Sequence, residues 1–177
     1  MTQLDFFHAT PSVPALSTTA PTFLADGTPD LPQRVALLAL WWDFAALVMG
    51  GWKPIETRTW EPRPPFAPGW LAICASLGRG PLKKRPMLPP GVPEPAPATC
   101  PRQALTGLVW VASWRPLVKA DMDRACYYEP GLVAWELAKI IRIPRPIPLA
   151  EIGLAKAPQN FTYIDRGHVL RALSPCP

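Results

Sequence analysis

The sequence contains very little histidine and no closely spaced pair of cysteines. Its two histidines, His8 and His168, lie near opposite ends of the 177 residues. Ser-His-Asp triads, ribonuclease sites with paired histidines and histidine-based zinc sites all need more histidine than this. Without a C-x-x-C pair, the four cysteines indicate free thiols and neither a metal site nor a redox dithiol. We therefore expect a protein that uses no histidine constellation, no metal ion and no other cofactor.

Long apolar runs are missing too. No stretch approaches the roughly 18 to 20 consecutive apolar residues of a membrane-spanning helix. The N-terminus lacks the basic and then apolar order of a secretion signal. The sequence predicts a cytoplasmic protein with no membrane partner, and it does not indicate which protein partners it has.

Proline and tryptophan are abundant instead, and both are unevenly distributed. The chain has 26 prolines and 8 tryptophans, and all the tryptophans lie between residues 41 and 135. Residues 1–33 hold five prolines and three aspartates but no lysine or arginine, which is typical of a flexible acidic leader. The remaining residues carry 18 basic and 10 acidic side chains, an excess of eight positive charges that favours an anionic partner.

A second proline-rich segment, residues 78–101, contains the basic run Lys83, Lys84 and Arg85. Its eight prolines exclude a helix interior or a strand ladder. We therefore expect an extended loop inserted between two strands. Its charges either serve solubility or bind phosphate groups.

The other residues show short strand-like and helix-like patterns. Residues 35–40 form a continuous apolar run that favours a buried strand, and residues 41–49 have helical spacing that ends at two glycines. Alternating side chains predict further strands at 53–60, 69–76 and 107–114, whereas 132–143 suits a helix or a strand. We expect an α+β, barrel-like domain of five to six strands with one or two flanking helices. It spans residues 34–165 and is followed by a C-terminal tail at 166–177.

The segment Gly51-Trp52-Lys53-Pro54-Ile55-Glu56-Thr57-Arg58-Thr59-Trp60 is the most informative in the chain. On a strand, Glu56, Arg58 and Trp60 project from one face. They would supply a hydrogen-bond acceptor, a forked donor and a stacking surface in one row, which suits a nucleobase. The alternative is an exposed strand face on which Glu56 and Arg58 form an ordinary ion pair.

Three stretches carry a wider pattern: Leu38-Ala39-Leu40-Trp41-Trp42-Asp43-Phe44-Ala45, the segment from Gly51 to Trp60, and Pro68-Gly69-Trp70-Leu71-Ala72-Ile73-Cys74-Ala75-Ser76. Together they resemble the ASCH domain, a member of the PUA-like superfold. The likeness continues through Gly107-Leu108-Val109 and Ala134-Trp135-Glu136-Leu137, so it covers roughly residues 35–149. The resemblance implies a β-pseudobarrel with a helix packed beside it. It also implies a ligand cleft lined by Lys53, Glu56 and Arg58, closed by Ser76 from the next strand, and a strand at 135–143. Members of the family are mainly associated with RNA or with recognition of modified bases.

The chain departs from the family pattern in two places. Many relatives have Gln-Pro-Trp at the start of the first helix, where this chain has Trp42-Asp43-Phe44, so we expect a more aromatic cleft wall that includes Trp42. Small relatives that hydrolyse 4-N-acetylated cytidine resemble this chain at Lys53 and Arg58, but they have a threonine where this chain has Glu56. Thr57 is adjacent, yet it is expected to face the other side of the strand. Those enzymes also need an acidic residue further along the chain, for which the candidates are Asp121, Asp123, Glu129 and Glu136.

The prediction that combines these features is a module that binds RNA or a modified nucleobase. Lys53, Glu56 and Arg58 would hold the ligand, with Trp60 and Trp70 as stacking surfaces, whereas Trp110 and Trp114 share a strand face and are expected in the core.

Two alternatives remain open. One is an enzyme, either an amidohydrolase acting on 4-N-acylated cytidine or a metal-independent ribonuclease, with Lys53 as its catalytic residue. Amidohydrolase chemistry needs a neutral Lys53 amine, which the neighbouring Glu56 opposes, so the sequence favours binding. The other is an interaction protein whose proline-rich segments dock onto partners.

Overall fold

The chain folds around one strongly curved, six-stranded mixed sheet. The computed structural model describes residues 19–62, 66–79, 84–96, 98 and 100–174. The elements are β1 (Arg34–Leu40), α1 (Trp42–Met49), β2 (Ile55–Arg58), β3 (Gly69–Ala75), β4 (Ala104–Pro116), η3 (Lys119–Asp121), α2 (Met122–Ala125), β5 (Val133–Pro148), η4 (Leu149–Ile152), β6 (Phe161–Asp165) and α3 (Arg166–Leu173). The strand order is β2-β5-β4-β3-β1-β6, in which β1 and β3 are parallel and the other pairs antiparallel. The predicted α+β class is confirmed.

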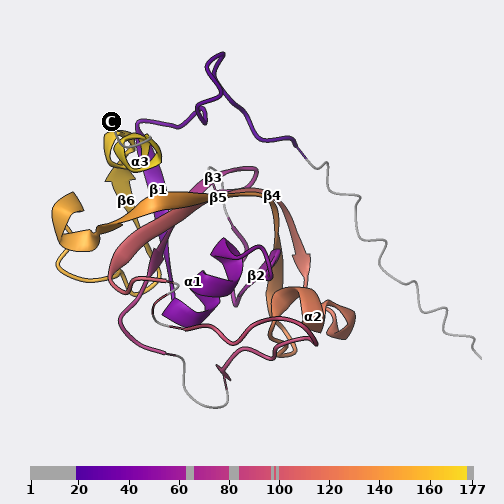
Figure 1. Cartoon of the computed structure of the whole chain (residues 1–177). Helices are drawn as coiled ribbons and strands as arrows, with labels where there is room; N and C mark the ends of the chain where they lie inside the picture. The colour runs from indigo at the N-terminus through magenta and orange to yellow at the C-terminus, as the bar shows by residue number, and fades with distance from the viewer. Residues whose placement is uncertain (1–18, 63–65, 80–83, 97, 99, 175–177) are drawn as a thin grey trace, which may run out of the picture.

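The sheet curls around α1 (Figure 1). Arg58, the last residue of β2, donates from Nη2 to the backbone oxygen of Ala39 in β1 at 3.0 Å. This bond joins two strands that the sheet order separates by three others, and so it closes the curve as the predicted pseudobarrel requires. None of the helices in the described part of the chain is long and apolar enough to cross a membrane.

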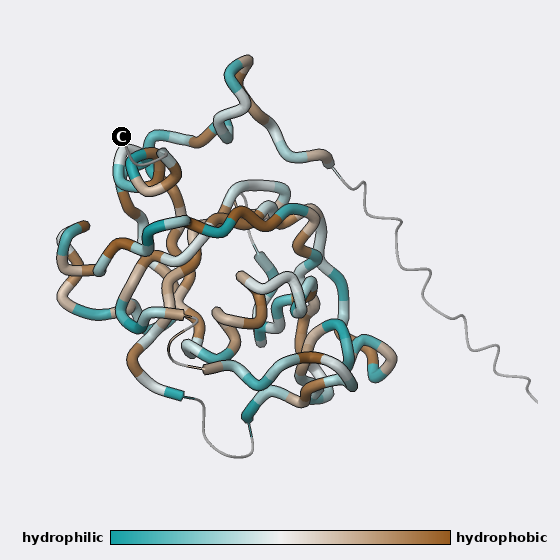
Figure 2. Tube along the Cα trace, in the orientation of Figure 1, coloured by the Kyte–Doolittle hydropathy of each residue, from teal (hydrophilic) through white to brown (hydrophobic). Residues whose placement is uncertain are grey.

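Side chains of β3 alternate between two cores, as the sequence pattern predicted. Leu71 and Ile73 point to the side that holds α1, and Trp70 and Ala72 point to the side that holds α3. Figure 2 shows hydrophobic residues concentrated along α1 and the surrounding strands. A Cβ atom at Gly107 in β4 would overlap the Met49 sulfur of α1, so only glycine allows the helix to pack this closely on the sheet.

Strand β5 settles the ambiguity at residues 132–143. It runs to Pro148 and pairs with β4 along its length, in agreement with the strand implied by the resemblance. The prediction that Trp114 shares the face of Trp110 was wrong. The β4 register shifts between Val111 and Ser113, and this bulge turns Trp114 toward the α1 core while Trp110 stays on the other side.

Both predicted terminal extensions contribute to the domain where they are described. In residues 19–33, the backbone oxygens of Thr19 and Thr22 accept hydrogen bonds from the indole N–H groups of Trp110 and Trp70, at 2.8 and 3.1 Å. Residues 166–173, which were assigned to a tail, form α3, and its Val169 is fully buried. Residues 1–18 and 175–177 lie outside the described residues. Domain boundaries at residues 33 and 165 would therefore cut through packed structure. Residues before 33 accept hydrogen bonds from two tryptophans of the domain, and residues after 165 form a helix that packs on it.

The insertion (residues 78–101) connects β3 to β4, as expected. Its described residues pack on the domain: Cys100 is buried, and Leu88 and Val92 lie against the α1 core. The backbone N–H of Met87 donates to the backbone oxygen of Cys126 at 2.8 Å. Lys83 lies outside the described residues.

Candidate nucleobase-binding site

A cavity of about 320 Å³ opens beside the motif strand β2. Its lining comes from residues 39–41 and Phe44 at the β1–α1 junction, Lys53 and residues 56–60 around β2, Ser76 after β3, Lys84 in the insertion, Tyr127, Glu129 and Leu132 between α2 and β5, and residues 158–160 before β6. Segments distant in sequence therefore meet at one site.

Lys53 is placed by the turn that ends α1. Gly51 adopts a left-handed conformation with φ of 76°, and the backbone N–H groups of Trp52 and Lys53 both donate to the backbone oxygen of Leu47. The chain then enters β2, where the backbone oxygen of Pro54 accepts from Leu137 of β5 at 2.9 Å. The turn and this pairing bury Lys53 just before β2, with only 1% of its surface exposed.

Three charged side chains form the buried floor of the cavity. Lys53 Nζ donates to Glu56 Oε2 at 2.8 Å and also to the backbone oxygen of Ile55. Arg58 Nε lies 3.0 Å from Glu56 Oε1, so both carboxylate oxygens of Glu56 face a cation. Glu56 and Arg58 share a strand face, as the period-two pattern predicted. The pair is not exposed, however, because the Glu56 side chain is only 7% accessible.

The surroundings of Glu56 favour its ionised form. Burial raises the pKa of this carboxyl, but the charges of Lys53 and Arg58, the hydrogen bond from Lys53 and the backbone N–H of Thr57 together outweigh burial. The pKa of Glu56 therefore lies below its ordinary value. A carboxylate held in this way is a permanent hydrogen-bond acceptor at the cavity floor.

Arg58 lines the cavity, and the one hydrogen bond of its guanidinium within the described structure runs from Nη2 to the backbone oxygen of Ala39. Its Nε is near Glu56, but the N–H is not aligned with the carboxylate, so this buried nitrogen makes no hydrogen bond within the described structure. Guanidinium has five donor hydrogens, and its planar fork matches the edge of a base or a phosphate.

Aromatic side chains line the cavity at Trp41, Phe44 and Trp60. Phe44 lies under the Lys53 ammonium, which is 5.5 Å from the ring centroid. Trp60 is held edge-on against Trp135, with the ring centroids 4.7 Å apart. Packing of this kind keeps an aromatic wall in a fixed orientation.

Two tryptophans predicted at the site lie elsewhere. Trp42 is 3% exposed and packs in the α1 core with the Arg79 and Arg102 guanidinium groups near its ring, while its neighbour Trp41 lines the cavity. Trp70 is on the opposite sheet face and 4% exposed. Trp41 and Trp42 could not both point inward from the helix start, and only the packing decided between them.

Lys84, Tyr127 and Glu129, which we call the mouth group, surround the exposed end of the cavity. Lys84 and Glu129 have 42% and 47% accessible side chains, against 1% for Lys53. The Tyr127 hydroxyl donates to Glu129 Oε2 at 2.8 Å, and burial together with this carboxylate raises the pKa of Tyr127 to about 12. Sequence reasoning missed Tyr127 and residues 158–160, for which no local pattern gave a signal. The aromatic wall expected at the start of the first helix is supplied by Trp41 and Phe44. Arg85 is exposed and, among the described residues, does not belong to the lining.

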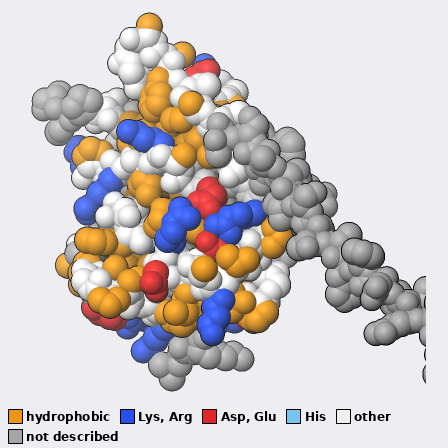
Figure 3. Space-filling model, turned by 90° about the vertical axis from the view of Figure 1, so that its right-hand side faces the viewer, with side chains coloured by type: hydrophobic (Ala, Val, Ile, Leu, Met, Phe, Trp, Pro, Cys, Tyr) orange, Lys and Arg blue, Asp and Glu red, His pale blue; other side chains and the backbone are white. Residues whose placement is uncertain are grey.

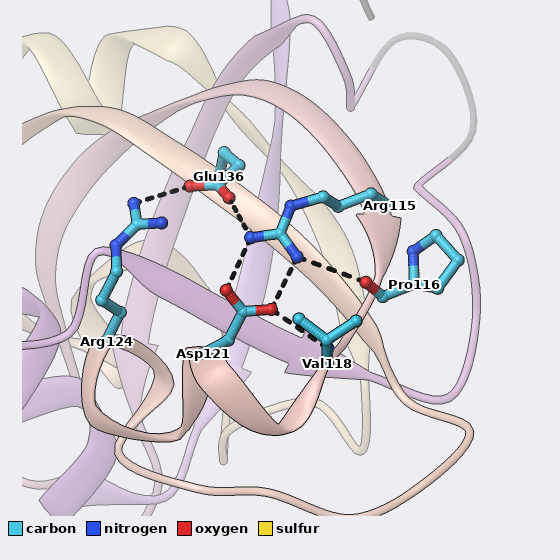
Figure 4. A network of polar contacts seen from close by, with 6 residues as sticks. All are labelled: Arg115, Pro116, Val118, Asp121, Arg124 and Glu136. Carbon is cyan, nitrogen blue, oxygen red and sulfur yellow. Dashed lines mark hydrogen bonds and ion pairs between the residues drawn. The ribbon is translucent and has the colours of Figure 1, made fainter. Parts of the chain in front are cut away.

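Of the four acidic candidates, only Glu129 lines the cavity within the described structure. Asp121 and Glu136 both bind Arg115 in a separate network (Figure 4), in which Asp121 accepts two hydrogen bonds at 2.6 and 2.7 Å. Asp123 is exposed. Thr57, expected on the far side of the strand, also borders the cavity, as does the whole stretch 56–60.

Among the comparisons with known proteins, the one with solved structures bears on the fold. No protein-family model matches the chain, and no curated protein matches it significantly. The crystal structure of ASCH from Zymomonas mobilis is similar to 79% of this chain and 94% of that chain, with a TM-score of 0.53 and 17% sequence identity. Two single-residue variants of that protein match with TM-scores of 0.52 and 0.51 at 17% identity, covering 80% and 77% of this chain and 96% and 94% of those chains. The predicted ASCH-like fold is confirmed.

Proposed function

We propose that the cavity binds a nucleobase, either within RNA or in a modified nucleoside. The observation that supports this most strongly is the buried floor of Lys53, Glu56 and Arg58 beneath aromatic walls. Glu56 supplies an acceptor for an exocyclic amine, and Arg58 supplies donors for a carbonyl oxygen. Trp41 and Trp60 supply surfaces on which any base can stack.

The size of the cavity fits this ligand class. Small-molecule sites usually enclose about 300 to 1,000 Å³, and about 320 Å³ lies at the lower end of that range. Such a volume suits one base with part of its sugar. Burying a polar base edge is favourable only where its hydrogen bonds are replaced, and the charged floor provides the replacements.

The surface charge supports a secondary contribution from phosphate groups. On the face drawn in Figure 3, basic side chains lie in small separate groups rather than in one continuous stripe. We therefore assign recognition to the cavity and only salt-dependent affinity to the basic groups of this face.

Fluorescence anisotropy with labelled single-stranded RNA, single-stranded DNA and hairpin RNA tests the proposal, with unlabelled nucleosides as competitors. Arg58→Lys keeps the charge but loses the fork, so we expect about a tenfold loss of affinity. Lys139→Gln removes a charge from an exposed position outside the described lining and is the matched control. A folded protein that binds none of these ligands at low salt would refute the proposal.

A hydrolase is the second candidate, and one observation favours it. Thr57 and Glu129 line the same cavity as Lys53, so the residue types of the cytidine-acting relatives are present, although at other positions. Against it, Lys53 is engaged by Glu56 and by the backbone oxygen of Ile55. Incubation with 4-N-acetylcytidine, monitored by ultraviolet absorbance, tests amide hydrolysis. Incubation with RNA in the presence of a metal chelator tests metal-independent cleavage. Activity that Lys53→Ala abolishes would favour the enzyme.

A further inference from the structure

The mouth of the cavity contains a lysine, Lys84, whose ammonium makes no hydrogen bond within the described structure. Lys84 Nζ lies 3.7 Å from Glu129 Oε2, which is too far for a hydrogen bond, and Tyr127 already donates to that oxygen at 2.8 Å. Within the described structure, no hydrogen bond uses the three donors of Lys84. A half-exposed ion pair of this length contributes little and is easily exchanged for another anion.

Lys84 is nevertheless held at the mouth by the chain that follows it. Three residues later, the N–H of Met87 is bonded to Cys126, which directly precedes Tyr127. The segment that carries Tyr127 and Glu129 therefore also holds the insertion three residues after Lys84.

The charges of the described residues around the cavity are unequal in number. Among these residues, the lining contains three cations, Lys53, Arg58 and Lys84, and two carboxylates, Glu56 and Glu129. Lys53 and Arg58 both contact Glu56 on the floor, whereas Lys84 stands at the exposed end. A neutral nucleoside would leave the excess positive charge unmatched, and a ligand with an anionic group at the mouth would match it.

We infer that Lys84 forms a phosphate subsite at the mouth of the cavity, so that the ligand is a nucleotide rather than a nucleoside without phosphate. This inference rests on the proposed function. The base would occupy the floor, and its phosphate would lie near Lys84, displacing Glu129 as the partner of the ammonium. The nucleotide is either free or part of a chain, since both present the same phosphate chemistry.

Titration calorimetry of the full chain separates these cases. The probes are the four ribonucleosides, their 5′- and 3′-monophosphates, and a dinucleotide, each with wild type, Lys84→Gln and Arg85→Gln. We expect wild type to prefer a phosphorylated probe, and Lys84→Gln to lose about five- to tenfold in affinity for it while its nucleoside affinity changes less than about twofold. Arg85→Gln, next in sequence but outside the described lining, should behave as wild type. Tighter binding of the dinucleotide than of either monophosphate would assign the phosphate to a chain, and the reverse would assign it to a free nucleotide.

The outcomes distinguish this inference from the proposed function. Equal wild-type affinity for nucleosides and monophosphates, or an equal loss for both in Lys84→Gln, would overturn the phosphate subsite and leave base binding intact. Binding of no probe and of no RNA would overturn both. Circular dichroism of both variants checks that they are folded, and Lys84→Arg, which keeps the charge, should restore the preference for phosphate.

Discussion

Replacing Glu56 by Gln tests whether the floor of the cavity depends on one buried carboxylate. Glutamine keeps the shape and one acceptor oxygen but removes the charge between Lys53 and Arg58. Lys53, 1% exposed, would then be a buried ammonium without a counter-charge. Removing one partner of a buried pair typically costs about 3 to 5 kcal/mol. Because glutamine still accepts a hydrogen bond, we expect about 3 kcal/mol, and a melting temperature lower by roughly 6 to 12 °C for a chain of this length.

Urea unfolding followed by tryptophan fluorescence measures this change. Glu129→Gln is the matched control, since its side chain lines the same cavity but is 47% accessible, and it should cost under about 0.5 kcal/mol. The double variant Lys53→Met with Glu56→Gln should be more stable than Glu56→Gln alone, because it removes the uncompensated charge. A loss under about 1 kcal/mol for Glu56→Gln, equal to that of the control, would refute the buried charge pairing as a source of stability.

The pH dependence supplies an independent check. The folded-state pKa of Glu56 lies below its ordinary value, so its charge stabilises the fold above the unfolded-state pKa of about 4.3. That contribution is lost as the pH falls through the folded-state pKa. The stability difference between wild type and Glu56→Gln should therefore be constant near neutral pH and should shrink below about pH 4. A difference that stays constant down to acid unfolding would contradict the shift.

Two further substitutions and one labelling experiment test other parts of the structure. Asp121→Asn breaks the two-point contact with Arg115 (Figure 4) and should cost about 1 to 2 kcal/mol in urea unfolding, whereas an unchanged midpoint would mean that solvent screens the pair completely. Gly107→Ala puts a methyl group into the Met49 side chain and should cost about 1 to 3 kcal/mol, with recovery when Met49→Ala is added; no recovery would assign the cost to the β5 backbone instead. Burial raises the pKa of the Cys74 thiol to about 12, so it should resist a thiol reagent at pH 8 until the protein unfolds, and rapid labelling of native protein would contradict its burial.

The motif strand was predictable from sequence because its determinants are local. Side chains two residues apart on a strand share a face, which joined Glu56 to Arg58. The alternation in β3 was visible for the same reason. Lys53 was added to the charged pair of β2 only by the resemblance to the ASCH domain, because it lies an odd number of residues away and its position depends on the turn at Gly51. Which face of β3 adjoins the cavity was not visible, so Trp70 was assigned to the wrong side.

Tertiary structure decided the rest, because those features depend on contacts between distant segments. A bulge in the β4–β5 pairing turned Trp114, and such a register shift leaves no local signature. The meeting of Lys84 with Glu129 depends on how a proline-rich insertion pairs with Cys126, directly after α2. By itself, the sequence determined that Glu56 and Arg58 share a strand face and offer an acceptor beside a forked donor, since this follows from the backbone period and the residue types. Only the tertiary structure determined the depth of the cavity and the charge at its mouth. Both depend on strands, turns and the insertion, which are distant in sequence and shield the cavity from water where they pack together.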